Sequence, residues 1–228
     1  MSNADLSKLH KRYTGEGASR YEKNRASGER WQREHEVTRA YLSRHTGKSV
    51  LDCPVGTGRF LPLYAAGAMS VVASDRSADM LTETRNRALS LGLENVSIVK
   101  ADATAEGAEL PECQVVVCVR FLNWLPADVA TPTFARLASR CTEEMIISLT
   151  TIDERKFSGS QLSAVRRRLE KSHDPKDGSD LPPNGPHSHD RFRSWLENTG
   201  MEVAERDVVA KGKGELEVAM YRLVKARA

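Results

Sequence analysis

The sequence has no apolar run near the ~18 residues that a helix needs to cross a bilayer. Residues 1–12 are polar and lack the apolar core of a secretory signal peptide. We therefore expect a cytoplasmic protein with no membrane partner. The length of 228 residues fits one α/β domain with a short appendage.

A strong excess of one charge is also missing. The net charge is +3, and Lys and Arg are interleaved with Asp and Glu. This balance argues against a nucleic-acid partner but leaves one open. Arg166, Arg167 and Arg168 form a basic cluster, and the helical pattern around them favours a solvated helix face.

The cysteines show neither a C-x-x-C pair nor zinc-ligand spacing. They are Cys53, Cys113, Cys118 and Cys141. Most of them fall in or beside expected strands, where free cysteines behave as small apolar residues. We expect buried thiols in a reducing compartment and no metal site.

Short apolar runs alternate with helical patterns through the middle of the chain. Strands are expected at 49–53, 71–75, 96–100, 115–119 and 145–149, with helices at 20–44, 58–67, 78–90 and 126–139. This β-α alternation predicts a parallel sheet with helices on both faces. The last third predicts a helix at 159–170, a mobile loop at about 171–189, a helix from Asp190 to Gly200, and a hairpin of 202–209 and 215–224.

The most informative segment is V-L-D-C-P-V-G-T-G-R-F, from Val50 to Phe60. Hydrophobic residues lead to Asp52, and the chain then turns through Gly56 and Gly58 into a helical pattern. Glycine lets a backbone bend tightly and lie close to a ligand. A second apolar run ends in Asp75, a position suited to bind ribose hydroxyl groups. The pattern predicts a nucleotide-binding strand–loop–helix–strand unit.

The run D-x-P-x-G-x-G resembles motif I of the class I S-adenosylmethionine (SAM) methyltransferases, (D/E)-x-G-x-G-x-G, with Pro54 at the first glycine. An acid in this loop would repel a dinucleotide pyrophosphate but suits a cationic amino-acid group. The resemblance implies a Rossmann-like α/β fold. Its seven-stranded, mostly parallel sheet would have an antiparallel last strand and helices on both faces. SAM would be the cofactor and S-adenosylhomocysteine (SAH) the product.

The resemblance also implies a division of the chain and a set of binding residues. Residues 1–45 would form an N-terminal lid helix region and residues 46–228 the methyltransferase domain. The implied cofactor-binding residues are Tyr21, Arg25, Asp52, Gly56, Gly58, Asp75, Arg76, Met80, Asp102, Ala103, Val119 and Arg120.

His187 and His189 are the candidates for a catalytic general base, because an unperturbed histidine titrates near neutrality. Two other interpretations stay open for them: loop and cap residues, or a metal-binding pair. The H-x-H spacing alone lacks further metal ligands.

The resemblance implies methyl transfer to an O, N or C nucleophile. We expect a small-molecule acceptor, because the N-terminal helix and the 171–189 loop could enclose a pocket, and we expect a monomer or homodimer. The N-P-P-Y signature of adenine and glutamine N-methyltransferases is absent, because R-F-L-N stands at 120–123. Four alternatives stay open: methylation of RNA, methylation of protein, SAM binding without catalysis, and a lyase that consumes SAM or an enzyme that uses decarboxylated SAM.

Overall fold

The computed structural model describes residues 28–161, 163–164, 186–211 and 216–226. A single mixed sheet organises them, with strand order β3-β2-β1-β4-β5-β8-β7 and the short β6 paired to β5. The strands are β1 (Ser49–Asp52), β2 (Ser70–Asp75), β3 (Val96–Lys100), β4 (Cys113–Cys118), β5 (Cys141–Ile152), β6 (His187–Ser188), β7 (Met201–Lys211) and β8 (Glu217–Lys225).

Strands β1 to β5 are parallel, and β8 runs antiparallel to both β5 and β7. The Rossmann-like sheet and the antiparallel last strand implied by the sequence are confirmed. The sheet has eight strands rather than seven because β6 adds two residues beside Thr151 and Ile152 of β5.

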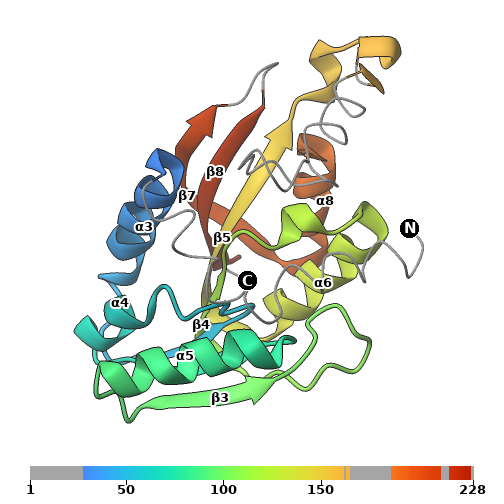
Figure 1. Cartoon of the computed structure of the whole chain (residues 1–228). Helices are drawn as coiled ribbons and strands as arrows, with labels where there is room; N and C mark the ends of the chain where they lie inside the picture. Colours follow the sequence, from blue (N-terminus) through green and yellow to red (C-terminus); the bar gives the residue numbers. More distant parts are fainter. Residues whose placement is uncertain (1–27, 162, 165–185, 212–215, 227–228) are drawn as a thin grey trace.

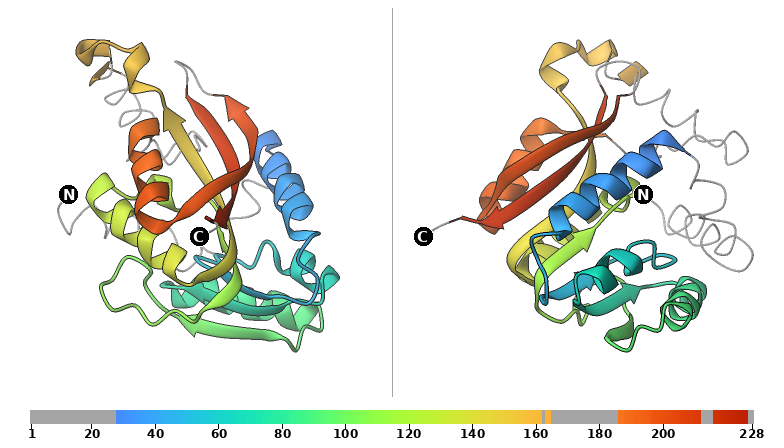
Figure 2. Two further views of the ribbon diagram at one scale, coloured as in Figure 1. Left: turned by 180° about the vertical axis from the view of Figure 1, so that it is seen from behind. Right: turned by 90° about the vertical axis from the view of Figure 1, so that its left-hand side faces the viewer.

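Helices cover both faces of the sheet (Figures 1 and 2). They are α3 (Glu29–Leu42), α4 (Leu61–Ala66), α5 (Ala78–Ser90), α6 (Ala127–Ser139) and α8 (His189–Thr199). The first three cover one face and the last two the other (Figure 2). Both faces of the central strands are therefore buried, which explains why β4 is apolar almost throughout.

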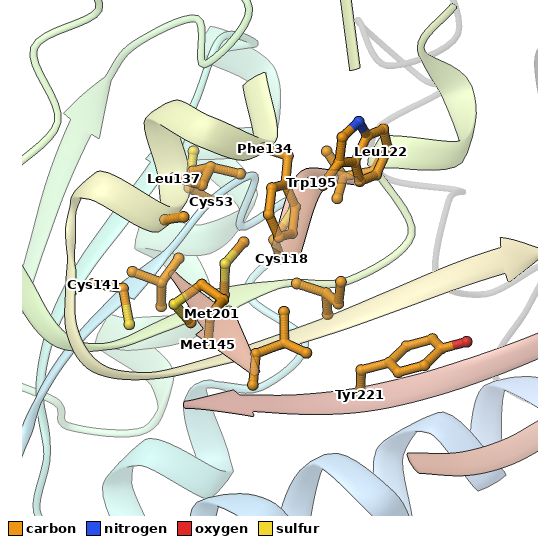
Figure 3. Close-up of a cluster of buried hydrophobic side chains, with 14 of the residues drawn as sticks. Cys53, Cys118, Leu122, Phe134, Leu137, Cys141, Met145, Trp195, Met201 and Tyr221 are labelled. Carbon is orange, nitrogen blue, oxygen red and sulfur yellow. The ribbon is translucent and has the colours of Figure 1, made fainter. Parts of the chain in front are cut away.

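An apolar core lies on each face. On the face of α6 and α8, the rings of Phe134 and Trp195 stack with centroids 5.2 Å apart, and Phe192 meets Tyr221 of β8 edge-on at 4.8 Å. Figure 3 shows this cluster and labels Cys53, Cys118 and Cys141 in it; Cys113 belongs to the same cluster. All four cysteines are free and buried, as the sequence predicts.

The central elements match their predicted positions closely. Ser77 caps α5 by accepting a hydrogen bond from the Met80 amide at 3.3 Å, and Gly200 ends α8 in the left-handed conformation. Strand β5 is longer than predicted, because pairing with β4, β6 and β8 extends it through polar residues at 142–144.

The segment before α8 differs from its prediction. His187 and Ser188 form β6, so the predicted loop at 171–189 ends before His187, and Ser188 caps a helix that begins at His189 rather than Asp190. Residues 171–185 lie outside the described residues, as do 20–27 of the first predicted helix.

The α3 helix is tied to the C-terminal hairpin. Tyr41 donates its hydroxyl to Asp207 at 2.8 Å, and Arg44 pairs with Glu205 at 2.7 Å. Arg222 of β8 joins this network by contacting both Glu205 and Glu144. The first described helix thus packs on the last strands of the chain.

The β1–α4 turn depends on Gly58, whose φ is +73°. A Cβ there would lie 2.8 Å from Leu61 Cδ1, and the Leu61 side chain is fully buried. Gly58→Ala should lower the free energy of unfolding by about 1–2 kcal/mol for the backbone conformation and about 1–3 kcal/mol more for the clash. Urea denaturation followed by circular dichroism measures the change.

Gly47→Ala is the matched control, because Gly47 has a φ of +74° and a Cβ there would meet nothing within 4 Å. Only the backbone cost applies to it. Equal losses in the two variants would show that the Leu61 contact relaxes without cost.

Candidate functional site

A cavity opens at the carboxyl edge of the parallel sheet, where β1 and β4 lie side by side. From β1 the chain proceeds to β2 on one side, and from β4 to β5 on the other. Ligands of open α/β sheets bind at such a switch point. The lining residues are Trp31, Asp52, Pro54, Val55, Gly56, Thr57, Arg59, Phe60, Asp75, Arg76, Ser77, Met80, Thr104, Val119, Arg120, Phe121, Trp124 and Leu125.

The glycine loop after β1 is held by side chains from neighbouring elements. Gly56 has a φ of +59°, and its amide donates to Asp75 Oδ2 at 3.0 Å. Its carbonyl accepts from Thr84 Oγ1 of α5 at 2.7 Å. Because Gly56 lines the cavity without a side chain, a ligand can approach its backbone closely.

Asp75, at the end of β2, lies in the cavity wall. Its Oδ1 accepts from the Ser77 amide at 2.8 Å, and its Oδ2 accepts from Gly56. Burial raises the pKa of Asp75, and these amide donors partly offset the effect. A carboxylate has about four lone-pair positions, so two accepted bonds leave capacity for the hydroxyl groups of a ligand.

Asp52 is 2% exposed at the end of β1 and also lines the cavity. Burial raises its pKa to about 7, with a further increase from Asp75, although the hydroxyl of Tyr64 donates to it at 2.8 Å. A cation in the cavity would favour the ionised form of Asp52.

Apolar and aromatic side chains form much of the remaining wall. Met80 of α5, 2% exposed, lies beside the acidic end of β2. Phe121, Trp124 and Leu125 follow β4 and face the same cavity. Such a wall suits a flat heterocycle and an apolar acceptor, and it keeps water from the polar groups.

One part of the site was only half predicted: the predicted binding residues include Arg120, but not Arg59 or Glu34. Arg59 and Arg120 line the cavity, and both contact the buried carboxylate of Glu34 on α3. The sequence does contain a signal for this ion pair. Glu34 lies on the same face of the helix as Trp31 and Tyr41, and an acid on a buried face needs a cationic partner.

Several predicted binding residues lie outside the cavity lining. Gly58 supports the turn, and the Ala103 side chain packs in the core. Asp102 accepts from the amide and hydroxyl of Thr104 at 2.9 and 2.6 Å, and its neighbour Thr104 lines the cavity instead. Tyr21 and Arg25 lie outside the described residues.

The two candidate bases also lie outside the cavity lining. His187 is 1% exposed, and its Nε2 is 3.0 Å from the carbonyl oxygen of Leu122. Burial lowers the pKa of His187, so the ring is neutral at pH 7. His189 begins α8 and is half-buried.

Within the described ranges, no group of three or more His, Cys, Asp or Glu side chains could hold a metal ion. No helix in the same part of the chain is long and apolar enough to cross a membrane.

Comparisons with known proteins agree with this geometry. A family model described as a methyltransferase domain matches residues 50–144. Residues 50–144 thus match the methyltransferase domain that the sequence resemblance implies. The fold implied by the sequence is therefore confirmed, and the matched family model agrees with the implied methyltransferase family.

Solved methyltransferase structures share the fold over almost the whole chain. Magnesium protoporphyrin IX methyltransferase (ChlM) from Synechocystis PCC 6803, with bound SAH, has a TM-score of 0.72 and 18% identity, covering 97% of this chain and 100% of that chain. For 1,6-didemethyltoxoflavin-N1-methyltransferase from Burkholderia thailandensis the TM-score is 0.65, the identity 14% and the coverages 98% and 88%. A comparison with curated proteins finds no match.

The raised pKa of Asp52 predicts how SAM binding to this domain depends on pH. With a pKa of about 7, Asp52 is mostly protonated at pH 6 and half ionised at pH 7. The cationic amino group of the methyl donor favours the ionised form, so the dissociation constant of SAH should fall about fivefold between these two pH values. An α-amino group with a pKa of about 7.7–8.0 stays charged over this range.

Calorimetric titration with SAH in buffers of different ionisation enthalpy would measure both the affinity and the proton released on binding. Asp52→Asn should remove the pH dependence and the proton release, because the amide does not titrate. A wild-type affinity that is flat from pH 6 to pH 7 would contradict an ionising Asp52 at this site.

Proposed function

We propose that the protein transfers a methyl group from SAM to an O, N or C nucleophile of a small-molecule acceptor. The observation that carries the proposal is one cavity that joins two buried carboxylates, a bare glycine backbone and an aromatic wall. When bound, SAM supplies an electrophilic methyl group on a sulfonium.

The residues of the cavity fit the parts of this cofactor. Asp75 has acceptor capacity for ribose hydroxyl groups, and the carboxylate of Asp52 suits the amino group. Gly56 leaves room for close approach to the backbone, and Met80 offers an apolar surface for the adenine. These residues would act by holding the reactants in position and excluding water.

Two observations support a small-molecule acceptor: the aromatic lining of the cavity, and the substrates after which the structurally similar enzymes are named. Trp31 of α3 and Trp124 after β4 line the cavity together, which favours an apolar or aromatic acceptor. ChlM and the toxoflavin enzyme are named for magnesium protoporphyrin IX and 1,6-didemethyltoxoflavin, both small molecules. The fold alone does not decide the reaction, since the [4+2]-cyclase SpnF shares it with a TM-score of 0.60 and 12% identity.

We also propose that His187 or His189 serves as the general base where the acceptor is protonated. Contact of Nε2 with the Leu122 carbonyl favours a proton on Nε2, which leaves Nδ1 of His187 as a proton acceptor. Among the described residues, Nδ1 of His187 has no hydrogen-bond partner. The ring is linked to the cavity wall through Leu122, which is next to the lining residue Phe121 in the chain.

Methyl transfer tests the main proposal directly. The protein, incubated with methyl-labelled SAM and a fractionated extract of its source cells, should label the small-molecule fraction. Asp75→Ala should lose most of this label, because the ribose contacts and the amide anchors of the loop are removed. Asp79→Ala removes an exposed acid of α5 outside the cavity lining and is the matched control.

Any other distribution of the label would favour one of the alternative functions. Label in RNA or protein would refute the small-molecule acceptor and direct attention to Arg166–Arg168, which lie outside the described residues. Binding of SAM without labelled product would favour a non-catalytic module, and breakdown of SAM without an acceptor would favour a lyase.

His187→Ala and His189→Ala test the base. One of them should reduce turnover at least tenfold and leave the affinity for SAH within twofold of wild type, because general-base catalysis contributes to the chemical step alone. Steady-state kinetics with the identified acceptor and calorimetry with SAH measure the two effects. Unchanged turnover in both variants would eliminate both histidines as the base.

A further inference from the structure

Glu34 is a fully buried carboxylate on α3 that three arginines contact. Arg30 Nε lies 2.9 Å from its Oε1, and Nη1 of Arg59 and of Arg120 lie 3.2 and 3.3 Å from its Oε2. Burial alone would raise the pKa of Glu34, but the guanidinium groups of Arg120, Arg30 and Arg59 outweigh it and hold the pKa below its usual value. Glu34 is therefore ionised in the folded protein.

Arg59 is fixed from several directions. Its guanidinium lies 3.6 Å from the centroid of the Trp31 ring, and it also donates to the Trp31 carbonyl oxygen. Phe60 lies on a further side at 4.9 Å. A guanidinium stacked on indole and bonded to a carboxylate keeps one orientation, because the two contacts together fix its plane.

Arg120 is fixed through its backbone as well as its side chain. Its φ is +61°, which is uncommon outside glycine, and its amide donates to Ser148 Oγ of β5 at 2.7 Å. Its guanidinium lies 5.4 Å from the Trp31 ring and contacts Glu34. A strained backbone at a cavity wall points to a functional constraint on the side chain.

Both of these arginines line the cavity, whereas Glu34 lies behind them. Glu34, Arg30, Arg59 and Arg120 together carry three positive charges and one negative charge. An arginine that faces a ligand without support must lose side-chain freedom on binding. Here Glu34 has already ordered two of them, and paired guanidinium groups bind a carboxylate in a defined orientation.

We infer that Glu34 is a positioning residue, which fixes Arg59 and Arg120 in the cavity wall as a receptor for a carboxylate ligand. The inference rests on the proposed function, which supplies two sources of such a group. One is the amino-acid part of SAM, and the other is a carboxylate on the acceptor.

The first part of the test compares the binding of two ligands that share the adenosine portion and differ in the amino-acid part. SAH carries the carboxylate, and 5′-methylthioadenosine lacks the whole amino-acid part. In Glu34→Gln the dissociation constant of SAH should rise at least tenfold, with that of methylthioadenosine within twofold of wild type. Equal weakening of both ligands would show a structural role alone and overturn the inference.

Glu36→Gln is the matched control, because Glu36 lies on the same helix, is about half-exposed and pairs with Arg33. It removes the same charge and should leave both affinities unchanged. Thermal melting checks that each variant is folded. Glu34→Asp keeps the charge with a shorter side chain and replaces Glu34→Gln if the latter melts below the assay temperature. It should weaken SAH alone, by a smaller factor.

The second arm examines an acceptor carboxylate. With the protein saturated by SAH, benzoate is titrated against its neutral analogue benzamide and followed by NMR. Benzoate binding that is present in wild type and lost in Glu34→Gln, with SAH affinity unchanged, would assign the receptor to the acceptor. If neither SAH nor benzoate responds to Glu34→Gln, the inference is wrong.

These results are separable from the main proposal. Methyl transfer by the wild-type protein tests the reaction, and the ratio of SAH to methylthioadenosine affinity tests the role of Glu34. A protein that transfers methyl groups but shows neither a changed ratio nor a changed benzoate affinity in Glu34→Gln would refute only the positioning role.

Discussion

Two acids, Asp52 and Asp75, end adjacent strands within one buried site, and the need to keep them there constrains the surrounding structure. Burial raises the pKa of both acids, and the charge of Asp75 raises that of Asp52 further. The amides of Gly56 and Ser77 donate to Asp75, and the hydroxyl of Tyr64 donates to Asp52. The bend of the glycine loop, the start of α5 and the position of α4 all supply these donors.

The positive charges of the cavity wall are supplied by arginines from other parts of the chain. Arg59 follows the glycine loop, Arg120 follows β4, and Glu34 on α3 contacts both. The cavity therefore offers acids and guanidinium groups to one ligand, as recognition of a zwitterionic amino-acid group requires. Apolar side chains between these groups limit hydration and strengthen each interaction.

The sequence predicts those features that depend on local pattern. The run from Asp52 to Gly58 and the position of Asp75 predict the glycine loop at the sheet edge, and the apolar runs locate most strands. Features that depend on tertiary pairing were missed. Strand β6 has two residues and forms because β5 offers an edge. The partners of Glu34 at residues 59 and 120 come from distant parts of the chain, so the sequence pattern does not name them. The resemblance implies a ligand contact for Asp102, and in the structure its carboxylate contacts Thr104 and Arg76.

The attachment of α3 to the C-terminal hairpin has a consequence for the order in which the site forms during synthesis. Tyr41 bonds to Asp207, 166 residues later in the chain, and α3 packs on β7 and β8. The acidic half of the cavity, from residues 52–80, is complete in sequence long before those strands leave the ribosome. Trp31 and Glu34 reach their final support only when the last strands have joined the sheet. During synthesis the glycine loop and its acids are thus present before the part of the cavity wall that α3 contributes is fixed in place. The enclosed site forms only in the finished chain.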